Sequence, residues 1–132
     1  MGQSVLIHGA GPIGIMCMMV AKAAGASQVM MTEVHNERLA LAKSLGASHT
    51  LYVKGMTPVE IRDAVVKSLG QEPEVTIECT GAQPCLESAI LATRPGGVLV
   101  MVGLGAPRIE LPIVEAALRE IDIRGVFRYA SW

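Results

Sequence analysis

Aromatic and charged residues are scarce in this sequence. Only 3% of its 132 residues are Phe, Trp or Tyr and 17% are charged, whereas 51% are hydrophobic. Eleven Lys and Arg stand against twelve Asp and Glu, so the net charge of −1 offers no attraction for nucleic acid or for an anionic membrane. The low aromatic content also argues against base-stacking surfaces and interfacial membrane belts. We therefore expect one aliphatic, soluble domain with no nucleic-acid or membrane partner.

Cysteine is scarce too, and no long hydrophobic run is present. Cys17, Cys79 and Cys85 are odd in number and lack the Cys-x-x-Cys spacing of zinc and redox motifs, so we expect no complete metal site in this chain. The apolar stretch 13–21 is too short to span a bilayer, and no Lys or Arg precedes it as a secretory signal requires. These features predict a cytoplasmic protein.

Glycine, by contrast, is frequent, and the 14 glycines separate aliphatic runs from segments with helical periodicity. This strict alternation predicts an α/β fold with a parallel sheet covered on both faces by helices. Two halves of three strands each are typical of the doubly wound, six-stranded NAD(P)-binding Rossmann fold, here as one domain over residues 1–132. We expect strands at 4–8, 28–33, 49–53, 74–78, 98–102 and 121–127, and helices at 13–24, 36–45, 58–69, 84–92 and 111–119.

Two of these helices carry local start signals. Asn36 is expected to cap the second helix, in which Leu39, Ala42 and Leu45 share an apolar face before Gly46. The segment 57–60, Thr-Pro-Val-Glu, combines a capping box with Pro at the first helical position and predicts the start of the third helix.

The first strand ends in a glycine motif, Gly9-Ala10-Gly11-Pro12-Ile13-Gly14, of the form Gly-x-Gly-x-x-Gly. Gly9 allows a tight turn, Gly11 allows a pyrophosphate to approach the backbone, and Gly14 allows the helix to pack closely on the sheet. The helix N-terminus then presents free N–H groups to phosphates. We take Gly9, Gly11, Pro12, Ile13 and Gly14 as candidate cofactor-binding residues; the alternative is a purely structural turn.

The choice of dinucleotide depends on Glu33, which ends the second strand nineteen residues after Gly14. A carboxylate at this position accepts hydrogen bonds from the adenosine ribose hydroxyls and repels a 2′-phosphate, so it favours NAD over NADP. Arg38 is the complication, because a nearby Arg can serve a 2′-phosphate. We favour the interpretation that it packs beside the adenine or simply caps the surface of its helix. The alternative for Glu33 is a solvated acid at a strand end.

Ligands of open parallel sheets bind beyond the carboxyl ends of the strands. That rule places three loops along the nicotinamide half of the site: Cys79-Thr80-Gly81, Val102-Gly103-Leu104 and Phe127-Arg128-Tyr129. Backbone groups beside Gly103 are expected to bond the carboxamide, and Arg128 to meet a phosphate or a polar substrate. The alternative is that the glycines serve only as turns and that Phe127 fills the sheet edge.

Six segments together resemble the zinc-dependent medium-chain dehydrogenase/reductase family: 9–14, 21–23, 78–82, 94–97, 102–105 and 120–129. The last of them, Glu-Ile-Asp-Ile-Arg-Gly-Val-Phe-Arg-Tyr, is the most specific and resembles the sorbitol dehydrogenase branch, with xylitol and L-arabinitol dehydrogenases as close alternatives. The resemblance implies that Ile13, Glu33 and Arg38 contact the adenosine side of NAD. It further implies that the nicotinamide side of NAD contacts residues 102–104 and 126–128, which include Val126. Arg128 and Tyr129 are implied to face a polyol.

The activity implied by the resemblance is NAD-dependent oxidation of a polyol to a ketose. The family's catalytic zinc is held by a separate catalytic domain, so we expect this chain to be the cofactor-binding domain alone, inactive in isolation, and to form a homo-oligomer through the edge of the sixth strand. One departure is Glu33, where the family more often has Asp. The alternatives are an NAD-binding redox sensor or regulator and the cofactor domain of a zinc-free reductase; the latter would favour NADPH, against Glu33.

Overall fold

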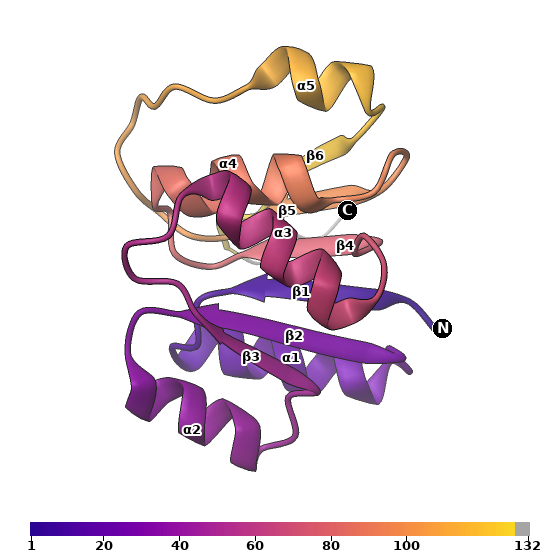
Figure 1. Cartoon of the computed structure of the whole chain (residues 1–132), viewed down its shortest axis with the longest axis vertical. Coiled ribbons are helices and arrows are strands. Elements are labelled where there is room, and N and C mark those ends of the chain that lie inside the picture. Colours follow the sequence, from indigo (N-terminus) through magenta and orange to yellow (C-terminus); the bar gives the residue numbers. More distant parts are fainter. Residues whose placement is uncertain (129–132) are drawn as a thin grey trace.

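Six parallel strands form one sheet in the computed structural model, which describes residues 1–128. The strands are β1 (Ser4–His8), β2 (Gln28–Glu33), β3 (His49–Tyr52), β4 (Val75–Glu78), β5 (Val98–Met101) and β6 (Asp122–Gly125). Their order is β3-β2-β1-β4-β5-β6, so the chain winds outward from β1 first in one direction and then in the other (Figure 1). The predicted doubly wound, six-stranded parallel sheet is confirmed.

Helices pack on both sides of this sheet. The described residues form α1 (Pro12–Ala23), α2 (Asn36–Ser44), α3 (Pro58–Leu69), α4 (Gln83–Ala92) and α5 (Ile113–Leu118). Helices α1 and α2 pack against β1, β2 and β3, whereas α3 lies on the opposite face, side by side with α4 (Figure 1).

Strand β1 shows how the sequence separates the two cores. Val5 and Ile7 pack with Met18 of α1 on one face, while Leu6 between them packs with Ile61 and Val65 of α3 on the other. Because successive side chains of a strand point to opposite faces, an unbroken aliphatic run is required where both faces are covered. All five residues of β1 are buried.

The half formed by β4, β5 and β6 departs from the prediction that both faces are covered. Leu99 is buried under α4, but Ile77 and Val100, which point to the other face, are only half-buried, and all of β6 is exposed. Helix α1 reaches this second face only at its β4 edge, where Val75 and Ile77 pack against the cluster that contains Met18. An apolar hollow of ≈ 360 Å³ lies there, lined by Ile77 and by α1 residues that include Ile13, Met16 and Val20.

Most predicted boundaries lie within one residue of the observed ones, and the exceptions have local causes. Asn36 was expected to cap α2 and does not: His35 holds the N-cap position, Asn36 is the first helical residue, and no side-chain cap bond forms. Leu45 is 44% exposed at the end of α2 and does not join its apolar face. Both α5 and β6 are shorter than expected, because four of the six α5 residues and all of β6 are exposed and have little packing to extend them.

The capping box of α3 is confirmed. The Thr57 hydroxyl accepts the Glu60 N–H at 3.2 Å, and the Glu60 carboxylate accepts the Thr57 N–H at 2.9 Å. The helix ends at Gly70, whose φ of 73° is the left-handed conformation that glycine adopts without strain.

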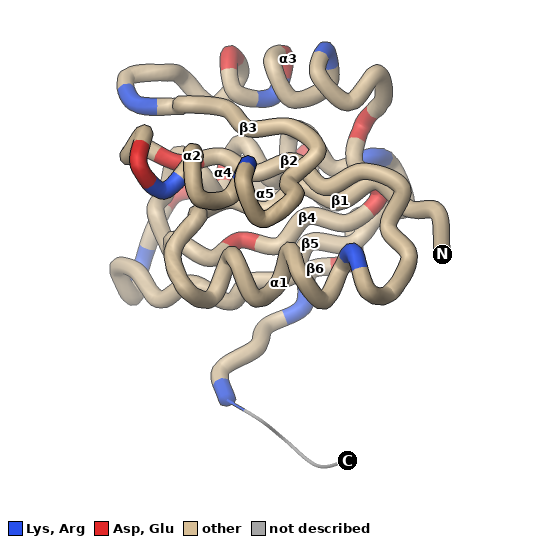
Figure 2. The backbone as a smooth tube through the Cα atoms, turned by 90° about the horizontal axis from the view of Figure 1, so that it is seen from below, with Lys and Arg blue, Asp and Glu red and all other residues tan. Residues whose placement is uncertain are grey.

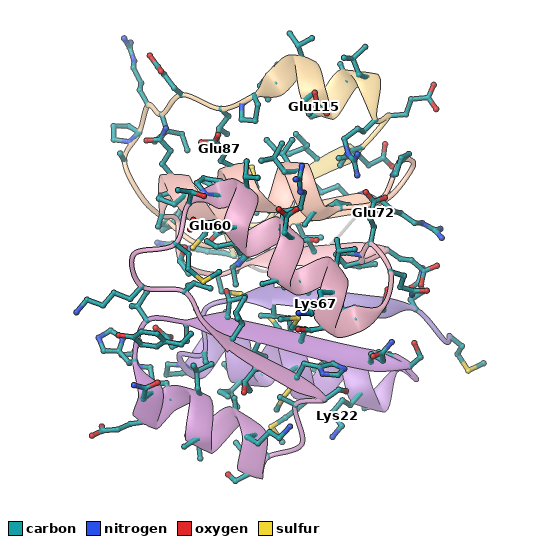
Figure 3. The ribbon with its side chains drawn as sticks, in the orientation of Figure 1. Lys22, Glu60, Lys67, Glu72, Glu87 and Glu115 are labelled. Atoms are coloured by element: carbon teal, nitrogen blue, oxygen red, sulfur yellow. The ribbon has the colours of Figure 1, made fainter. Side chains whose placement is uncertain are left out.

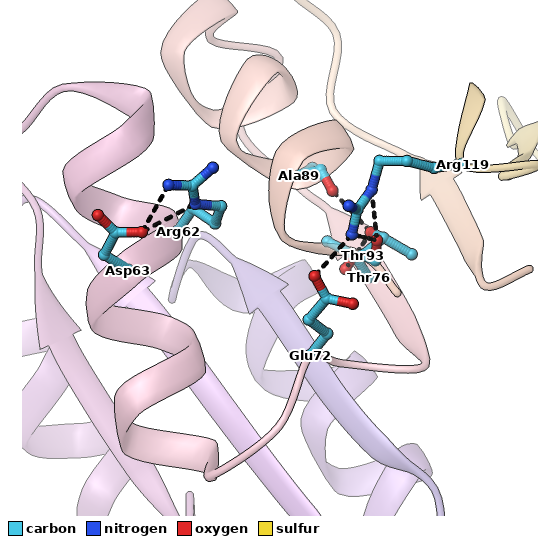
Figure 4. Close-up of polar contacts among 7 residues, drawn as sticks. All are labelled: Arg62, Asp63, Glu72, Thr76, Ala89, Thr93 and Arg119. Atoms are coloured by element: carbon cyan, nitrogen blue, oxygen red, sulfur yellow. Dashed lines mark hydrogen bonds and ion pairs between the residues drawn. The ribbon is translucent and has the colours of Figure 1, made fainter. Parts of the chain in front are cut away.

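A polar cluster holds the ends of β4, α4 and α5 together (Figure 4). Arg119 donates to the Glu72 carboxylate at 2.8 Å and to the Thr93 carbonyl at 2.7 Å. The Thr93 hydroxyl meets the Thr76 hydroxyl at 2.8 Å and the Ala89 carbonyl at 2.6 Å. These contacts satisfy polar groups that would otherwise be buried without partners.

Surface charge is dispersed over the chain rather than gathered in a stripe of one sign (Figure 2). Helices carry exposed charged residues such as Lys22, Glu60 and Lys67 (Figure 3), and Lys22 donates to the Gly46 carbonyl at 2.6 Å. Over residues 1–128, no helix has the length and apolar character needed to cross a bilayer.

Candidate functional site

The predicted site residues gather at the carboxyl edge of the sheet. Strand β1 lies between β2 and β4, so the glycine turn after His8 lies between the ends of β2 and β4. The chain reverses its winding direction here, and this switch point is where open α/β sheets bind ligands. The loops after β4 and β5 continue the same edge on one side of the turn.

The glycine turn has the close contacts that its sequence predicts. Gly9 has a φ of 95°, and its N–H donates to the Thr32 carbonyl at 2.9 Å. A Cβ at Gly14 would overlap the Gly9 carbonyl oxygen, so only glycine allows α1 to start so near the turn. Gly11 caps α1 without a side-chain bond, and Pro12 is the first helical residue. The N-terminus of α1 therefore offers its N–H groups to an anion.

Glu33 lies directly beside this turn and is only 7% exposed. Its Oε2 accepts the Ala10 N–H at 3.0 Å and its Oε1 the Val34 N–H at 2.7 Å, while His35 Nδ1 and Arg38 Nη1 lie 3.1 and 3.6 Å from the carboxylate. Burial alone would raise the pKa of Glu33. The two backbone N–H groups, His35 and Arg38 outweigh that effect and hold its pKa below the ordinary value. Glu33 is therefore ionised at neutral pH.

Beside Glu33, a cavity of ≈ 110 Å³ opens between the end of β2 and the loop after β4. The prediction from sequence missed most of its lining, because these residues lie far apart in the chain and carry no motif. Only the order of the strands brings them together. The lining residues are Thr32, Glu33, Val34, Val53, Thr80, Ala82 and Cys85.

The loop after β4 is organised by a buried carboxylate that the sequence did not single out, Glu78. Its oxygens accept the N–H groups of Thr80 and Gly81, each at 2.8 Å, and the Thr80 hydroxyl as well. The Cys79 thiol in this loop is not poised for ionisation, because burial, with a contribution from Cys17, raises its pKa to about 12. Burial also raises the pKa of Cys85. Both thiols are protonated at neutral pH.

The remaining predicted residues continue along β5 and β6. The N–H groups of Val102 and Gly103 both donate to the Glu78 carbonyl, and Leu104 is exposed. Val126 donates to the Met101 carbonyl at 2.9 Å, so residues 126–128 lie beside the end of β5.

Past Val126, the aromatic and cationic side chains of the predicted site are exposed. The Arg128 guanidinium lies 4.8 Å from the ring centre of Phe127, and both residues are accessible. Tyr129 lies outside the described residues.

The comparisons with known proteins agree with this geometry. Residues 12–132 match the family model described as zinc-binding dehydrogenase. The chain belongs to this family. Mouse sorbitol dehydrogenase is 51% identical over 131 residues, which is 99% of this chain and 37% of that protein. This member of the zinc-binding dehydrogenase family thus spans little more than a third of the length of the curated relatives that it matches.

Solved structures of related dehydrogenases share its fold. A 2R,3R-butanediol dehydrogenase from Bacillus subtilis superposes with a TM-score of 0.88 at 26% identity, over 97% of this chain and 36% of that one. An Escherichia coli alcohol dehydrogenase complexed with cofactor NADH superposes with a TM-score of 0.80 at 25% identity, over 94% and 36%.

The family is named for zinc, but residues 1–128 do not provide a zinc site. Over that range, no group of three or more His, Cys, Asp or Glu side chains is placed to hold a metal ion. The protonated thiols Cys79 and Cys85 would have to ionise before ligating. We therefore assign no chemical step to a metal at these residues.

Proposed function

We propose that this chain is the NAD(H)-binding domain of a polyol dehydrogenase. The family membership and the 51% identity to mouse sorbitol dehydrogenase support this assignment, as does the NADH complex of a structurally similar alcohol dehydrogenase. The polyol is a proposal drawn from the relatives' names, because this chain covers only about a third of their length.

In this proposal the pyrophosphate binds at the N-terminus of α1, where Gly11 leaves the backbone open. The Glu33 carboxylate accepts the hydroxyls of the adenosine ribose. Arg38 covers the adenosine from α2; its Nη1 lies 4.0 Å from the point that a Cβ on Gly11 would occupy. When bound, NAD supplies the hydride acceptor; the residues above orient it and shield it from water.

The nicotinamide end is assigned to the loops after β4, β5 and β6: Cys79, Thr80, Val102, Gly103, Leu104, Val126, Phe127 and Arg128. Arg128 and Tyr129 are proposed to face the polyol.

We further propose that the zinc ligands and the rest of the catalytic domain belong to a part of the longer protein outside residues 1–132. We therefore expect this chain alone to produce no NADH from NAD and sorbitol, and zinc-dependent production by it would contradict the assignment.

The observation that carries the cofactor assignment is the position of Glu33. An ionised carboxylate that is nearly buried and bonded to the glycine turn itself through Ala10 has a fixed position beside the anion site. A 2′-phosphate there would meet like charge, whereas a ribose diol would donate to the carboxylate. NAD is therefore favoured over NADP.

The test is Glu33→Ser, with NADH and NADPH titrated by fluorescence. We expect NADH affinity to fall about tenfold, because one charged hydrogen-bond acceptor is lost, and the preference over NADPH to shrink. Glu37→Ser in the first turn of α2 is the matched control, since Glu37 is exposed and lies outside the site. An unchanged preference in a folded Glu33→Ser protein would overturn the assignment.

We also propose a homo-oligomer formed through β6. This strand lies at the edge of the sheet, and all four of its residues are exposed, so its outer backbone groups are available for pairing. Elution volumes from gel filtration at several concentrations test this proposal; a monomer at every concentration would contradict it.

We also propose a cytoplasmic location. The support is that Cys17, Cys79 and Cys85 are free thiols, and free thiols persist in reducing compartments.

A further inference from the structure

Glu78 is a fully buried acidic residue that the proposed function leaves unused. Within residues 1–128, no Lys, Arg or His side chain forms an ion pair with it. Its carboxylate is held instead by the loop that follows β4: the Thr80 N–H donates to Oε1 and the Gly81 N–H to Oε2, both at 2.8 Å, and the Thr80 hydroxyl also donates to Oε1. A buried carboxylate satisfied in this way stabilises one loop conformation.

The main chain of Glu78 holds the next loop. Its carbonyl oxygen accepts the Val102 N–H at 2.9 Å and the Gly103 N–H at 2.8 Å, so the ends of β4 and β5 meet at this one residue. The two loops also touch without any intervening side chain. A Cβ at Gly103 would overlap the backbone nitrogens of Thr80 and Gly81, and a Cβ at Gly105 would overlap the Gly81 carbonyl oxygen.

Thr80 extends this arrangement to the glycine turn. A Cβ at Gly9 would lie 3.0 Å from the Thr80 methyl carbon, so the Thr80 side chain packs directly on the turn. The Thr80 hydroxyl, besides donating to Glu78, accepts the Ala82 N–H at 2.9 Å just before α4 begins. The loop after β4 therefore sits between the glycine turn and the loop after β5, and its conformation depends on Glu78.

We propose that Glu78 is a positioning residue for the nicotinamide end of the cofactor. The inference rests on the proposed function, which assigns the loops 79–81 and 102–104 to that end. Glu78 acts on both loops, through its side chain and its carbonyl, and touches neither the glycine turn's anion site nor Glu33. Its role is to keep the backbone groups of the two loops in the arrangement that receives the nicotinamide.

A carboxylate is required at this position because the two backbone N–H groups point at different oxygens. In Glu78→Gln the side-chain volume is unchanged, but one acceptor oxygen becomes an NH₂ group. Whichever way the amide turns, its NH₂ faces either the Thr80 N–H or the Gly81 N–H, and two donors cannot bond each other. The loop must move to relieve this contact, or one N–H stays buried without a partner.

The experiment compares NADH with ADP-ribose, which keeps the adenosine and pyrophosphate but lacks the nicotinamide. Calorimetry measures both dissociation constants for the wild type, for Glu78→Gln and for Glu74→Gln. Glu74 is the matched control: it immediately precedes β4 at the opposite end of that strand, where it pairs with Arg94 at 2.8 Å and accepts the Ser4 N–H at 2.9 Å.

We expect Glu78→Gln to weaken NADH binding about tenfold, the effect of one lost hydrogen bond in a buried network, and ADP-ribose binding less than twofold. Glu74→Gln should leave the ratio of the two constants unchanged, although it lowers stability. A Glu78→Gln protein that binds both ligands like the wild type, or that loses affinity for both equally, would overturn the proposal. So would a wild type that binds NADH no better than ADP-ribose.

Two further results keep the outcome clear. If Glu78→Gln fails to fold, Thr80→Val takes its place, since it removes the hydroxyl that donates to Glu78 and accepts the Ala82 N–H but leaves the two backbone bonds to the carboxylate. A weaker loss confined to NADH is expected, and an equal loss for both ligands contradicts the proposal. If the wild type binds neither ligand, the proposed function itself fails, which is a different result from any of those above.

Discussion

The two halves of the sheet have the same topology but not the same burial. Strands β1 and β2 are buried on both faces, between α1 and α2 on one side and α3 on the other. In β4 and β5 the buried side chains all lie on the α4 face and those on the other face are only half-buried, and β6 is exposed throughout. The difference shows that a parallel sheet does not by itself guarantee two covered faces; the number of helices on each side decides that.

The difference also separates the two ends of the site. The proposed adenosine end lies on the doubly covered half, where Glu33 is held by Ala10 and Val34. The proposed nicotinamide end lies on the other half, where the Glu78 carboxylate accepts the N–H groups of Thr80 and Gly81. We therefore expect substitutions in the two halves to have unequal effects.

The largest effect is expected in β1. Leu6 is completely buried against α3, so Leu6→Ala should lower the free energy of unfolding by about 3 kcal/mol through lost burial and the cavity left behind. Val100→Ala is the comparison in β5; Val100 is half-buried, and we expect about 1 kcal/mol. Urea titration measures both, and equal losses would show that the two halves are equally packed.

The second effect concerns His8, which joins the halves: its Nδ1 lies 2.7 Å from Thr32 Oγ1 of β2 and its Nε2 3.3 Å from Ser88 Oγ of α4. Complete burial lowers the pKa of His8 from 6.5 to about 4. Between these values the unfolded chain binds a proton that the native protein does not. Stability due to His8 should therefore be intact above pH 6.5 and fall as the pH drops to 4, by about 3 kcal/mol in total.

Free energies of unfolding measured from pH 7 to pH 4 test this prediction. In His8→Asn, which keeps a polar group but does not titrate, most of that slope should disappear. The control is His35→Asn, because the His35 side chain is 63% exposed. A slope that persists in His8→Asn would assign the acid sensitivity to other groups.

A smaller effect is expected at α3, the helix that carries the chain from the first half to the second. Thr57→Ala removes the side-chain half of the capping box and should cost about 1 kcal/mol. Thr57→Ser keeps the hydroxyl and should cost a few tenths at most. Thermal unfolding of the two variants distinguishes them, and identical midpoints would mean that the cap adds nothing to the stability of α3.

The smallest effect is expected on the uncovered face. Val20 on α1 is 68% exposed and lines the apolar hollow beside Ile77, so Val20→Lys should change the free energy of unfolding by less than about 0.5 kcal/mol. Chemical denaturation measures it. A loss above about 1.5 kcal/mol would show that this face is packed after all, and would remove the contrast between the halves.

Much of the architecture could be predicted from local signals. Three features depend on residues close together in the chain, and each forms as expected: the aliphatic strands, the capping box at Thr57 and the glycine motif. The prediction for Asn36 was wrong, because the preceding His35 takes the cap position. The position of Glu33 beside the glycine turn could also be predicted, since β1 and β2 are consecutive neighbours in the sheet.

Other features of the site could not be predicted, because they depend on contacts between distant segments. Glu78 looked like one more strand residue, and only the neighbouring β5 shows that its carbonyl also holds the loop after that strand. Cys85 and Val53 share a cavity although they lie in different halves of the chain. The positions of the nicotinamide loops remain a prediction.

The sequence by itself determined the order and type of the elements and the chemistry of the glycine turn, because periodicity, glycine and capping act over a few residues. Only the tertiary structure decided which strands lie side by side. That arrangement covers β1 and β2 on both faces, leaves β6 exposed, and brings the loop after β5 to the Glu78 carbonyl. The physical reason is that burial and hydrogen bonding depend on distance in space, and residues far apart in the chain meet only when the sheet has formed.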